Sequence, residues 1–141
     1  MKNLLNDSVN NPGFSINKTI KGKLPRLPFA DIKNEILGKK YELSLVFIGD
    51  KRARTLNQTY RKKDYTPDIL TFPYNKKEGE IFINPHQARM RAKDFDMSEK
   101  KFIAFLFIHG LLHLKGLRHG STMDRLELKH LKRLYRHTRN L

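Results

Sequence analysis

The chain has 141 residues, with 29 Lys and Arg, 14 Asp and Glu, and no cysteine. This length is typical of one domain that buries its own hydrophobic core, and the absence of cysteine excludes disulfides, thiolate metal sites and cysteine nucleophiles. The formal net charge of +15 favours an anionic partner, either a nucleic acid or a membrane surface.

The first residues predict a tail rather than a signal peptide. Residues 1–12 are polar and lack the apolar centre of a secretion signal, so we expect a flexible N-terminal tail followed by a single domain over residues 13–141. The longest apolar run, Phe102–Ile108, is far shorter than the roughly 20 residues that span a bilayer. Together with the missing cysteines, these features favour a cytoplasmic protein that does not enter a membrane.

Hydrophobic periodicity in the first half predicts two strands and two helices. In order they are a strand over residues 14–20, a helix over 30–37, a strand over 41–48 and a helix over 50–61. The first strand is expected to reach Ile20. Asp50 is the expected N-cap of the second helix, and Tyr60 is expected on its buried face.

The second half predicts a hairpin followed by three helices. The hairpin strands cover residues 69–72 and 80–83, and the helices cover 85–93, 98–115 and 121–139. Pro85 suits a first helical position, Ser98 suits an N-cap, and Ser121 with Asp124 opens the last helix. The inner stripe of that helix is predicted at Leu126, Leu131 and Leu134.

This order of elements predicts an α+β fold. We expect a single domain with a small mixed sheet of four strands and helices packed on it. The helix that contains the run Phe102–Ile108 should be the most buried, and it should place the metal-binding residues on a rigid central element.

Three histidines gather at the end of that helix. His109 and His113 are four residues apart, so they lie on one helical face and can share one metal ion. Gly116 is a natural helix stop, after which the chain can turn and offer His119 as a third ligand. Three histidines leave a fourth position for water, as in catalytic zinc sites. The alternative for the His109–His113 pair by itself is ordinary core packing.

Two basic stretches are candidates for contact with phosphates. One is the loop that begins at Arg61 and continues through Lys62 and Lys63; the other is the polar face of the last helix. Such a face would give binding a steep salt dependence. The alternative for both is a solvated surface. The candidates in and before the last helix are Arg118, Arg125, Lys129, Lys132 and Arg136.

The chain resembles the YbeY family of metal-dependent endoribonucleases, which are rRNA maturation factors. The likeness rests on residues 56–73, LNQTYRKKDYTPDILTFP, on 79–81, GEI, and on 109–119, HGLLHLKGLRH. It extends from about residue 30 to the last helix.

The resemblance implies a site, a cofactor and a substrate. His109, His113 and His119 match the family's three metal ligands, with one zinc ion per chain. Arg61 matches an arginine that faces the metal across an RNA-binding cleft. The implied partners are single-stranded RNA and rRNA, with a ribosomal subunit or assembly proteins as further partners and no DNA. The implied function is zinc-dependent endonucleolytic cleavage in rRNA maturation and ribosome quality control, with Arg61 stabilising the phosphoryl transition state.

Several positions depart from the family pattern, among them Arg118, Glu80, Thr71 and the displaced order of Thr66-Pro67-Asp68. Arg118 stands where the family commonly has an acid just before the third histidine, and an arginine cannot accept a proton. Glu80 stands where the family more often has aspartate. These departures leave the general base unassigned.

Two other classes compete with the nuclease. A zinc protease of the H-E-x-x-H type needs a glutamate beside the first histidine, and this chain has Gly110 there. A non-catalytic rRNA-binding assembly factor with a structural zinc is the main alternative, and Arg118 favours it.

Overall fold

A computed structural model describes residues 13–137 of the chain. Its elements, in order, are β1 (Phe14–Lys18), α2 (Phe29–Leu37), β2 (Glu42–Phe47), α3 (Asp50–Arg61), β3 (Ile69–Asn75), β4 (Glu78–Ile83), α4 (Pro85–Ala92), the short 3-10 helix η1 (Lys93–Phe95), α5 (Glu99–Leu114) and α6 (Ser121–His137). The tail expected over residues 1–12 and the last residues of the helix expected to reach Arg139 lie outside the described residues.

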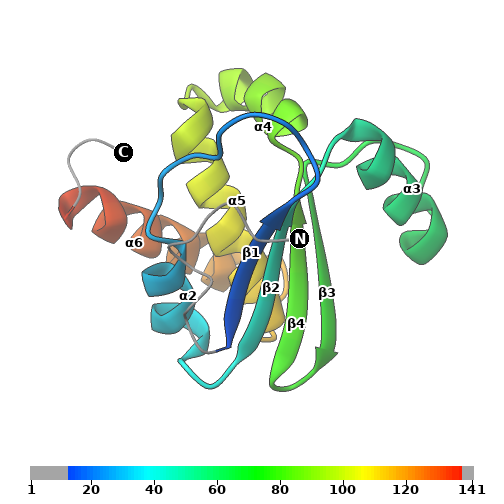
Figure 1. Cartoon of the computed structure of the whole chain (residues 1–141). Coiled ribbons are helices and arrows are strands. Elements are labelled where there is room, and N and C mark those ends of the chain that lie inside the picture. Colours follow the sequence, from blue (N-terminus) through cyan, green and yellow to red (C-terminus); the bar gives the residue numbers. More distant parts are fainter. Residues whose placement is uncertain (1–12, 138–141) are drawn as a thin grey trace.

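The four strands form one mixed sheet in the order β1-β2-β4-β3 (Figure 1). β1, β2 and β4 run parallel, and β3 pairs antiparallel with β4 as a hairpin. The predicted α+β fold with a mixed four-stranded sheet is therefore confirmed. β3 continues through Pro73, where the sequence predicted its end, because an edge strand tolerates a proline and the register shifts between Pro73 and Asn75.

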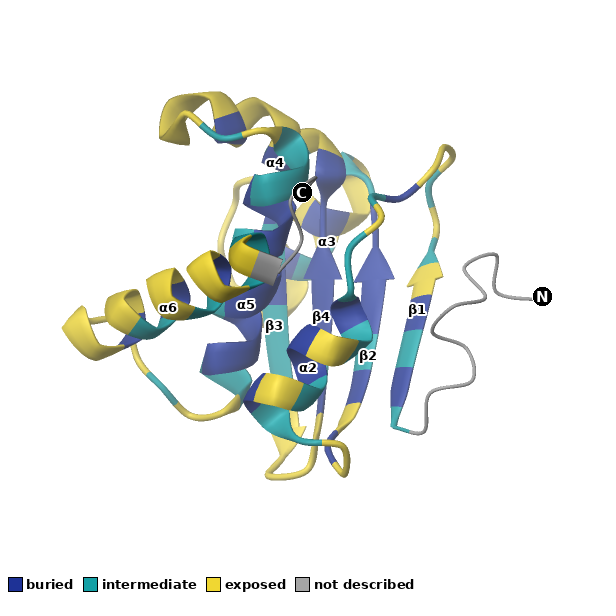
Figure 2. Cartoon of the chain, turned by 90° about the vertical axis from the view of Figure 1, so that its left-hand side faces the viewer, coloured by how far each residue is buried: buried dark blue, intermediate teal, exposed yellow. Residues whose placement is uncertain are grey.

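Helix α5 is the central element of the core (Figure 2). It packs on β3 and β4 on one side and on α2, α4 and α6 on the others. Its residues Ile103, Phe107, Ile108 and Leu111 are fully buried. The expectation that the histidine-bearing helix is the most buried one is confirmed, and this burial fixes the position of the histidines that follow.

Helix α3 lies apart from the other helices, on the other side of the sheet and near its upper end only (Figure 1). Ala53 packs there with Val46 and Phe82 in a smaller apolar cluster.

Two predictions for α3 were wrong. Tyr60 was expected on the buried face of the helix, but it is 67% exposed. Gly49 is the N-cap, and Asp50 begins the helix because its carboxylate is engaged elsewhere, accepting a hydrogen bond from Asn84 at 2.8 Å.

The first strand is shorter than predicted. β1 ends at Lys18, so Ile20 lies outside the sheet, although it still packs against the main core. Among residues 13–137, no helix is both long enough and apolar enough to cross a membrane.

Lys33 is a charged side chain inside α2 with no exposed surface. Its ammonium donates to the Lys39 carbonyl at 3.3 Å. Burial lowers the pKa of Lys33 below its ordinary value of 10.5, and the nearby charge of Glu42 opposes that shift only in part. A charge held in this environment destabilises the fold.

We expect Lys33→Met to raise the free energy of unfolding at pH 7 by about 1–2 kcal/mol, because it removes the buried charge and keeps the length of the side chain. In the wild type, the unfolded chain binds more protons at position 33 between the lowered pKa and 10.5. The free energy of unfolding of the wild type should therefore rise through that pH window. The difference in free energy of unfolding between Lys33→Met and the wild type should shrink accordingly. Urea unfolding at several pH values measures this. Exposed Lys40→Met is the control, and a less stable Lys33→Met would contradict the expectation.

Candidate metal centre

The end of α5 positions the three histidines. His109 and His113 project from its last two turns, and the helix closes at Lys115. Gly116 then takes a positive φ of 109°. Its N–H donates to the His113 carbonyl at 2.9 Å, and the N–H of Leu117 donates to the Leu112 carbonyl at 3.0 Å. This pair of bonds is a Schellman motif, and it turns the chain so that His119 returns toward the helix.

The three imidazoles converge on one point. One nitrogen from each of His109, His113 and His119 lies within 4.8 Å of the other two. The Nε2 atoms of His109 and His113 are 3.1 Å apart. Two ligands of one tetrahedral ion, each at 2.0–2.1 Å, would lie about 3.3 Å apart. The convergence predicted from the sequence is confirmed, and the three side chains can hold a metal ion.

The second nitrogen of two of these rings is already engaged. Nδ1 of His113 donates to the Leu117 carbonyl at 3.1 Å. Nδ1 of His109 contacts the carboxylate of Glu127. A carbonyl and a carboxylate can only accept, so each favours the tautomer with its proton on Nδ1, and the Nε2 lone pairs of His109 and His113 then face and repel each other. A cation between them relieves that repulsion, so the donor set fits a metal.

His113 is tuned toward its neutral form. Burial, followed by the charges of His109, His119 and Arg61, lowers the pKa of His113, and the hydrogen bond to the Leu117 carbonyl opposes these effects only in part. A histidine must be neutral to bind a metal. The lowered pKa therefore favours the form that serves as a ligand.

Glu127 is a site residue that sequence reasoning missed. It is buried on α6 between Met123 and Leu131, four residues from each. An acid within the apolar stripe of an amphipathic helix is the signal that could have identified it, because a buried carboxylate needs a partner. That partner is His109.

We expect Glu127→Ala to lower the affinity for zinc by about 10- to 100-fold, because an outer partner that orients a ligand histidine typically contributes that much. Glu127→Gln should lose less, since its carbonyl oxygen can still accept the Nδ1 proton. Competition with a chromophoric chelator measures both. Glu35→Ala is the matched control, because Glu35 pairs with His130 outside the cluster. Equal zinc affinity in Glu127→Ala and the control would contradict this role.

A cleft of about 620 Å³ opens beside the histidines. His109, His119 and Glu127 line it, and so does the loop before β3. Ligand sites commonly have volumes of about 300–1,000 Å³. The cleft therefore offers room for a substrate next to the ion that the histidines can hold.

The packing around Gly110 leaves no room for the glutamate that the zinc-protease pattern requires at this position. A Cβ atom at this position would lie 3.0 Å from Ile81, 3.1 Å from Ile69 and 3.3 Å from Thr71. Position 110 therefore faces the sheet rather than the cleft, and a glutamate there would have no room to act as a base.

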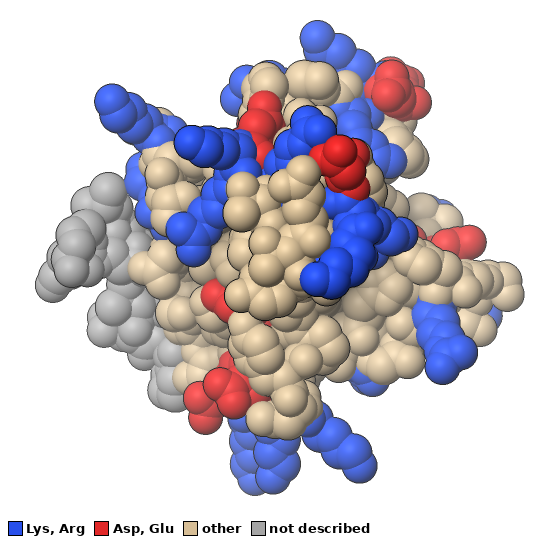
Figure 3. Space-filling model, turned by 90° about the vertical axis from the view of Figure 1, so that its right-hand side faces the viewer, with Lys and Arg blue, Asp and Glu red and all other residues tan. Residues whose placement is uncertain are grey.

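The predicted basic residues lie on two exposed surfaces. Arg61, Lys62 and Lys63 lie at the end of α3, and the charge of Arg61 acts on His113. Figure 3 shows Lys and Arg side chains gathered over the upper part of the face that α3 occupies. Arg118 is also exposed, just before His119. The exposed basic residues of α6 include Arg125, Lys129, Lys132 and Arg136.

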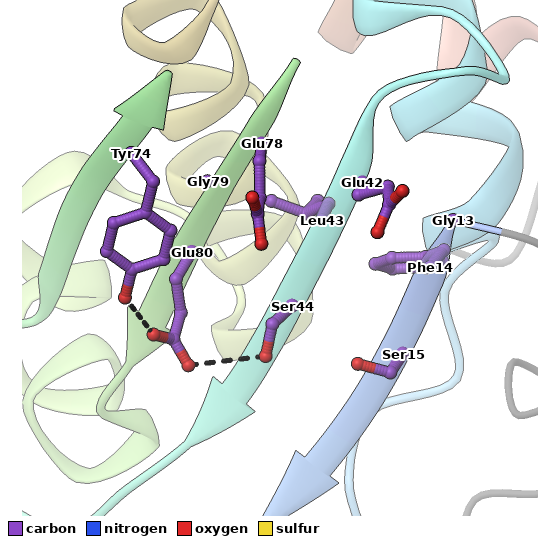
Figure 4. Close-up of a pocket in the computed structure, with 10 residues that line it drawn as sticks. All are labelled: Gly13, Phe14, Ser15, Glu42, Leu43, Ser44, Tyr74, Glu78, Gly79 and Glu80. Carbon is purple, nitrogen blue, oxygen red and sulfur yellow. Dashed lines mark hydrogen bonds between the residues drawn. The ribbon is translucent and has the colours of Figure 1, made fainter. Parts of the chain in front are cut away.

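A second hollow lies on the sheet and is acidic (Figure 4). Glu42, Glu78 and Glu80 line it, and the Glu80 carboxylate accepts hydrogen bonds from Tyr74 and, at 3.3 Å, from Ser44. The hydrogen bond to Glu80, with burial and the Glu80 charge adding to it, raises the pKa of Tyr74 to about 12. Three carboxylates repel a polyanion, so this hollow does not suit the path of a phosphate backbone.

The chain matches known proteins over nearly all of the described residues. A family model described as Endoribonuclease YbeY matches residues 14–139. A protein named Endoribonuclease YbeY from a Nitratiruptor species is 45% identical over 83 residues, which cover 56% of this chain and 58% of that protein. Another of that name from Alkaliphilus metalliredigens is 34% identical over 100 residues, covering 63% and 64%.

The fold also matches a solved structure. A protein from Thermotoga maritima, determined in solution, superposes with a TM-score of 0.64 at 25% identity, covering 89% of this chain and 92% of that one. The sequence matches, by contrast, span about three fifths of the length of the two curated relatives.

Proposed function

The chain belongs to the YbeY family, and from that membership we propose that it is a metal-dependent endoribonuclease that cleaves single-stranded RNA. We propose rRNA as its substrate in the cell, zinc as its metal, one ion per chain, and the cytoplasm as its location. A ribosomal subunit or its assembly proteins would bring the enzyme to that substrate. The observation that carries the proposal is the convergence of three imidazoles beside a cleft that two of them, His109 and His119, line.

His109, His113 and His119 would hold the metal. A zinc ion bound there supplies Lewis acidity and lowers the pKa of a water molecule that it binds. The chain's own contribution is orientation: the Leu117 carbonyl keeps the Nδ1 proton of His113 in place, and Glu127 does the same for His109. Both contacts hold the rings in the orientation that a ligand needs.

Arg61 would act on the scissile phosphate. Its guanidinium is exposed and free to bind a phosphate, and its charge is among those that lower the pKa of His113, which supports a place on the side of the histidine cluster. A guanidinium binds two phosphoryl oxygens at once and stabilises the charge that grows on them. Lys62, Lys63 and Arg118, with the basic face of α6, would attract the RNA and hold its backbone.

The direct test is cleavage of a labelled single-stranded RNA by the zinc-loaded protein. We expect internal cuts, loss of cleavage when a chelator removes the metal, and recovery when zinc returns. The same sequence as a duplex, and as single-stranded DNA, should resist cleavage. Absence of cleavage by protein with one equivalent of zinc would overturn the proposal.

A structural zinc in a non-catalytic rRNA-binding protein is the second candidate, and Arg118 is the observation that favours it. In that case the chelator should unfold the protein, and no cut RNA should appear beforehand. Circular dichroism recorded during the chelation experiment separates the two candidates, because a catalytic metal can leave a core of this size folded.

A further inference from the structure

The cleft beside the histidines has an aromatic wall. Rings follow one another from the exposed Phe95 to Phe105, with centroids 6.4 Å apart, and from Phe105 to His109, at 6.2 Å. The buried Phe102 packs against both phenylalanines, with ring centroids at 5.2 and 5.9 Å. A continuous series of rings thus leads from the surface to a candidate metal ligand.

Two rings of this cleft are exposed although they are large and apolar. Phe95 is 45% exposed and Tyr65 is 48% exposed, and both line the cleft. The Arg91 guanidinium lies 5.5 Å from the centre of the Phe95 ring. The buried amide of Asn57 holds the backbone of Tyr65 by donating to its carbonyl at 3.1 Å. Exposed aromatic rings are what unstacked bases pack against.

The charges inside the cleft decide which part of an RNA can enter it. Three carboxylates line it, those of Asp68, Asp124 and Glu127, against the single guanidinium of Arg91. Asp68 is buried and already paired with Arg91 at 2.6 Å. When one phosphate lies at the histidines, these carboxylates disfavour a second phosphate in the rest of the cleft, while a neutral nucleobase is not repelled. The basic residues at which phosphates can bind lie outside the cleft.

We propose that this cleft is a nucleobase-binding subsite, in which Phe95 and Tyr65 stack an unpaired base of the RNA whose phosphate lies at the histidine cluster. The subsite rests on the proposed function, since it assigns a place to part of that substrate. It also supplies a reason for single-strand specificity, because a base inside a duplex cannot leave its stack to fill the cleft without losing its pairing.

Binding, measured without cleavage, tests the subsite. The probe is a short 2′-O-methyl oligonucleotide that carries one 2-aminopurine, compared with the same oligonucleotide carrying an abasic position there. Stacking on an aromatic side chain contributes enough for a roughly five- to 100-fold difference in affinity. We expect the zinc-loaded wild type to prefer the base-bearing probe by such a factor and to quench its fluorescence.

Variants assign the effect to the two rings. Phe95→Ala and Tyr65→Ala should each lose most of the preference and the quenching. Phe95→Leu keeps apolar volume against Phe102 and should fold normally, but it should lose the stacking signal as well. Tyr74→Ala is the matched control, because Tyr74 is 58% exposed and lines the other hollow; it should bind like the wild type.

The outcomes separate the subsite from the nuclease. Equal affinity for the two probes, or unchanged quenching in Phe95→Leu and Tyr65→Ala, overturns the subsite. If those variants also cut RNA at the wild-type rate, the nuclease survives and the subsite does not. Base-dependent binding by a protein that cuts no RNA supports the subsite and refutes the nuclease.

Discussion

His113→Ala is expected to lower the affinity for zinc by more than about 100-fold and to abolish RNA cleavage. Loss of an outer partner of a ligand histidine typically costs 10- to 100-fold in affinity, and loss of the ligand itself should cost more. Both nitrogens of His113 are assigned: Nδ1 is bound to the Leu117 carbonyl, and Nε2 faces His109. Unlike the loss of His109, the loss of His113 leaves the buried Glu127 carboxylate with its partner. Titration calorimetry with zinc measures the affinity directly.

A stability measurement gives an independent check on the same variant. Zinc that binds only the folded wild type should stabilise it by about 2.7 kcal/mol at 100 times the dissociation constant, and this gain should be absent in His113→Ala. His86→Ala is the control, since His86 pairs with Asp50 away from the cluster, and it should keep the full gain. If His113→Ala binds zinc as tightly as His86→Ala does, the cluster is not the metal site.

The central helix and its histidines could be predicted because they depend on local sequence signals. The apolar run Phe102–Ile108 gives the buried helix, Ser98 begins it by accepting from the Lys101 N–H at 3.1 Å, and Gly116 ends it. Helical spacing then places His109 above His113. These steps need no knowledge of the rest of the fold, and the structure confirms each of them.

Features that depend on contacts between distant elements could not be predicted in this way. Glu127 meets His109 only because α6 packs on α5, so the predicted stripe of Leu126, Leu131 and Leu134 omitted it. Asp50 failed as an N-cap because its carboxylate is bound at the start of α4. Both errors have one cause: a polar side chain takes the partner that the tertiary fold brings to it, whatever its helical position suggests.

Arg61→Ala is expected to lower the turnover number for RNA cleavage by roughly 10²- to 10³-fold, which corresponds to about 3–4 kcal/mol of transition-state stabilisation, while zinc binding stays unchanged. This is the usual cost of removing one preorganised donor to a developing oxyanion. Arg61 is exposed and has no ion pair among residues 13–137, so the variant should fold normally. A rate measured under single-turnover conditions, with zinc content determined on the same sample, tests the prediction.

Two further variants separate a role in catalysis from one in attraction. Arg52→Ala, in the same helix and also exposed, removes the same charge and should only weaken RNA binding and reduce its salt dependence. Arg61→Lys keeps the charge but cannot engage two phosphoryl oxygens in one plane. It should therefore bind RNA as the wild type does, while its turnover number stays nearly as low as that of Arg61→Ala.

If Arg61→Lys cuts RNA at the wild-type rate, charge alone suffices and the bidentate contact is not part of the chemistry. If Arg61→Ala matches Arg52→Ala in turnover, Arg61 belongs to the attracting surface and takes no part in the chemistry.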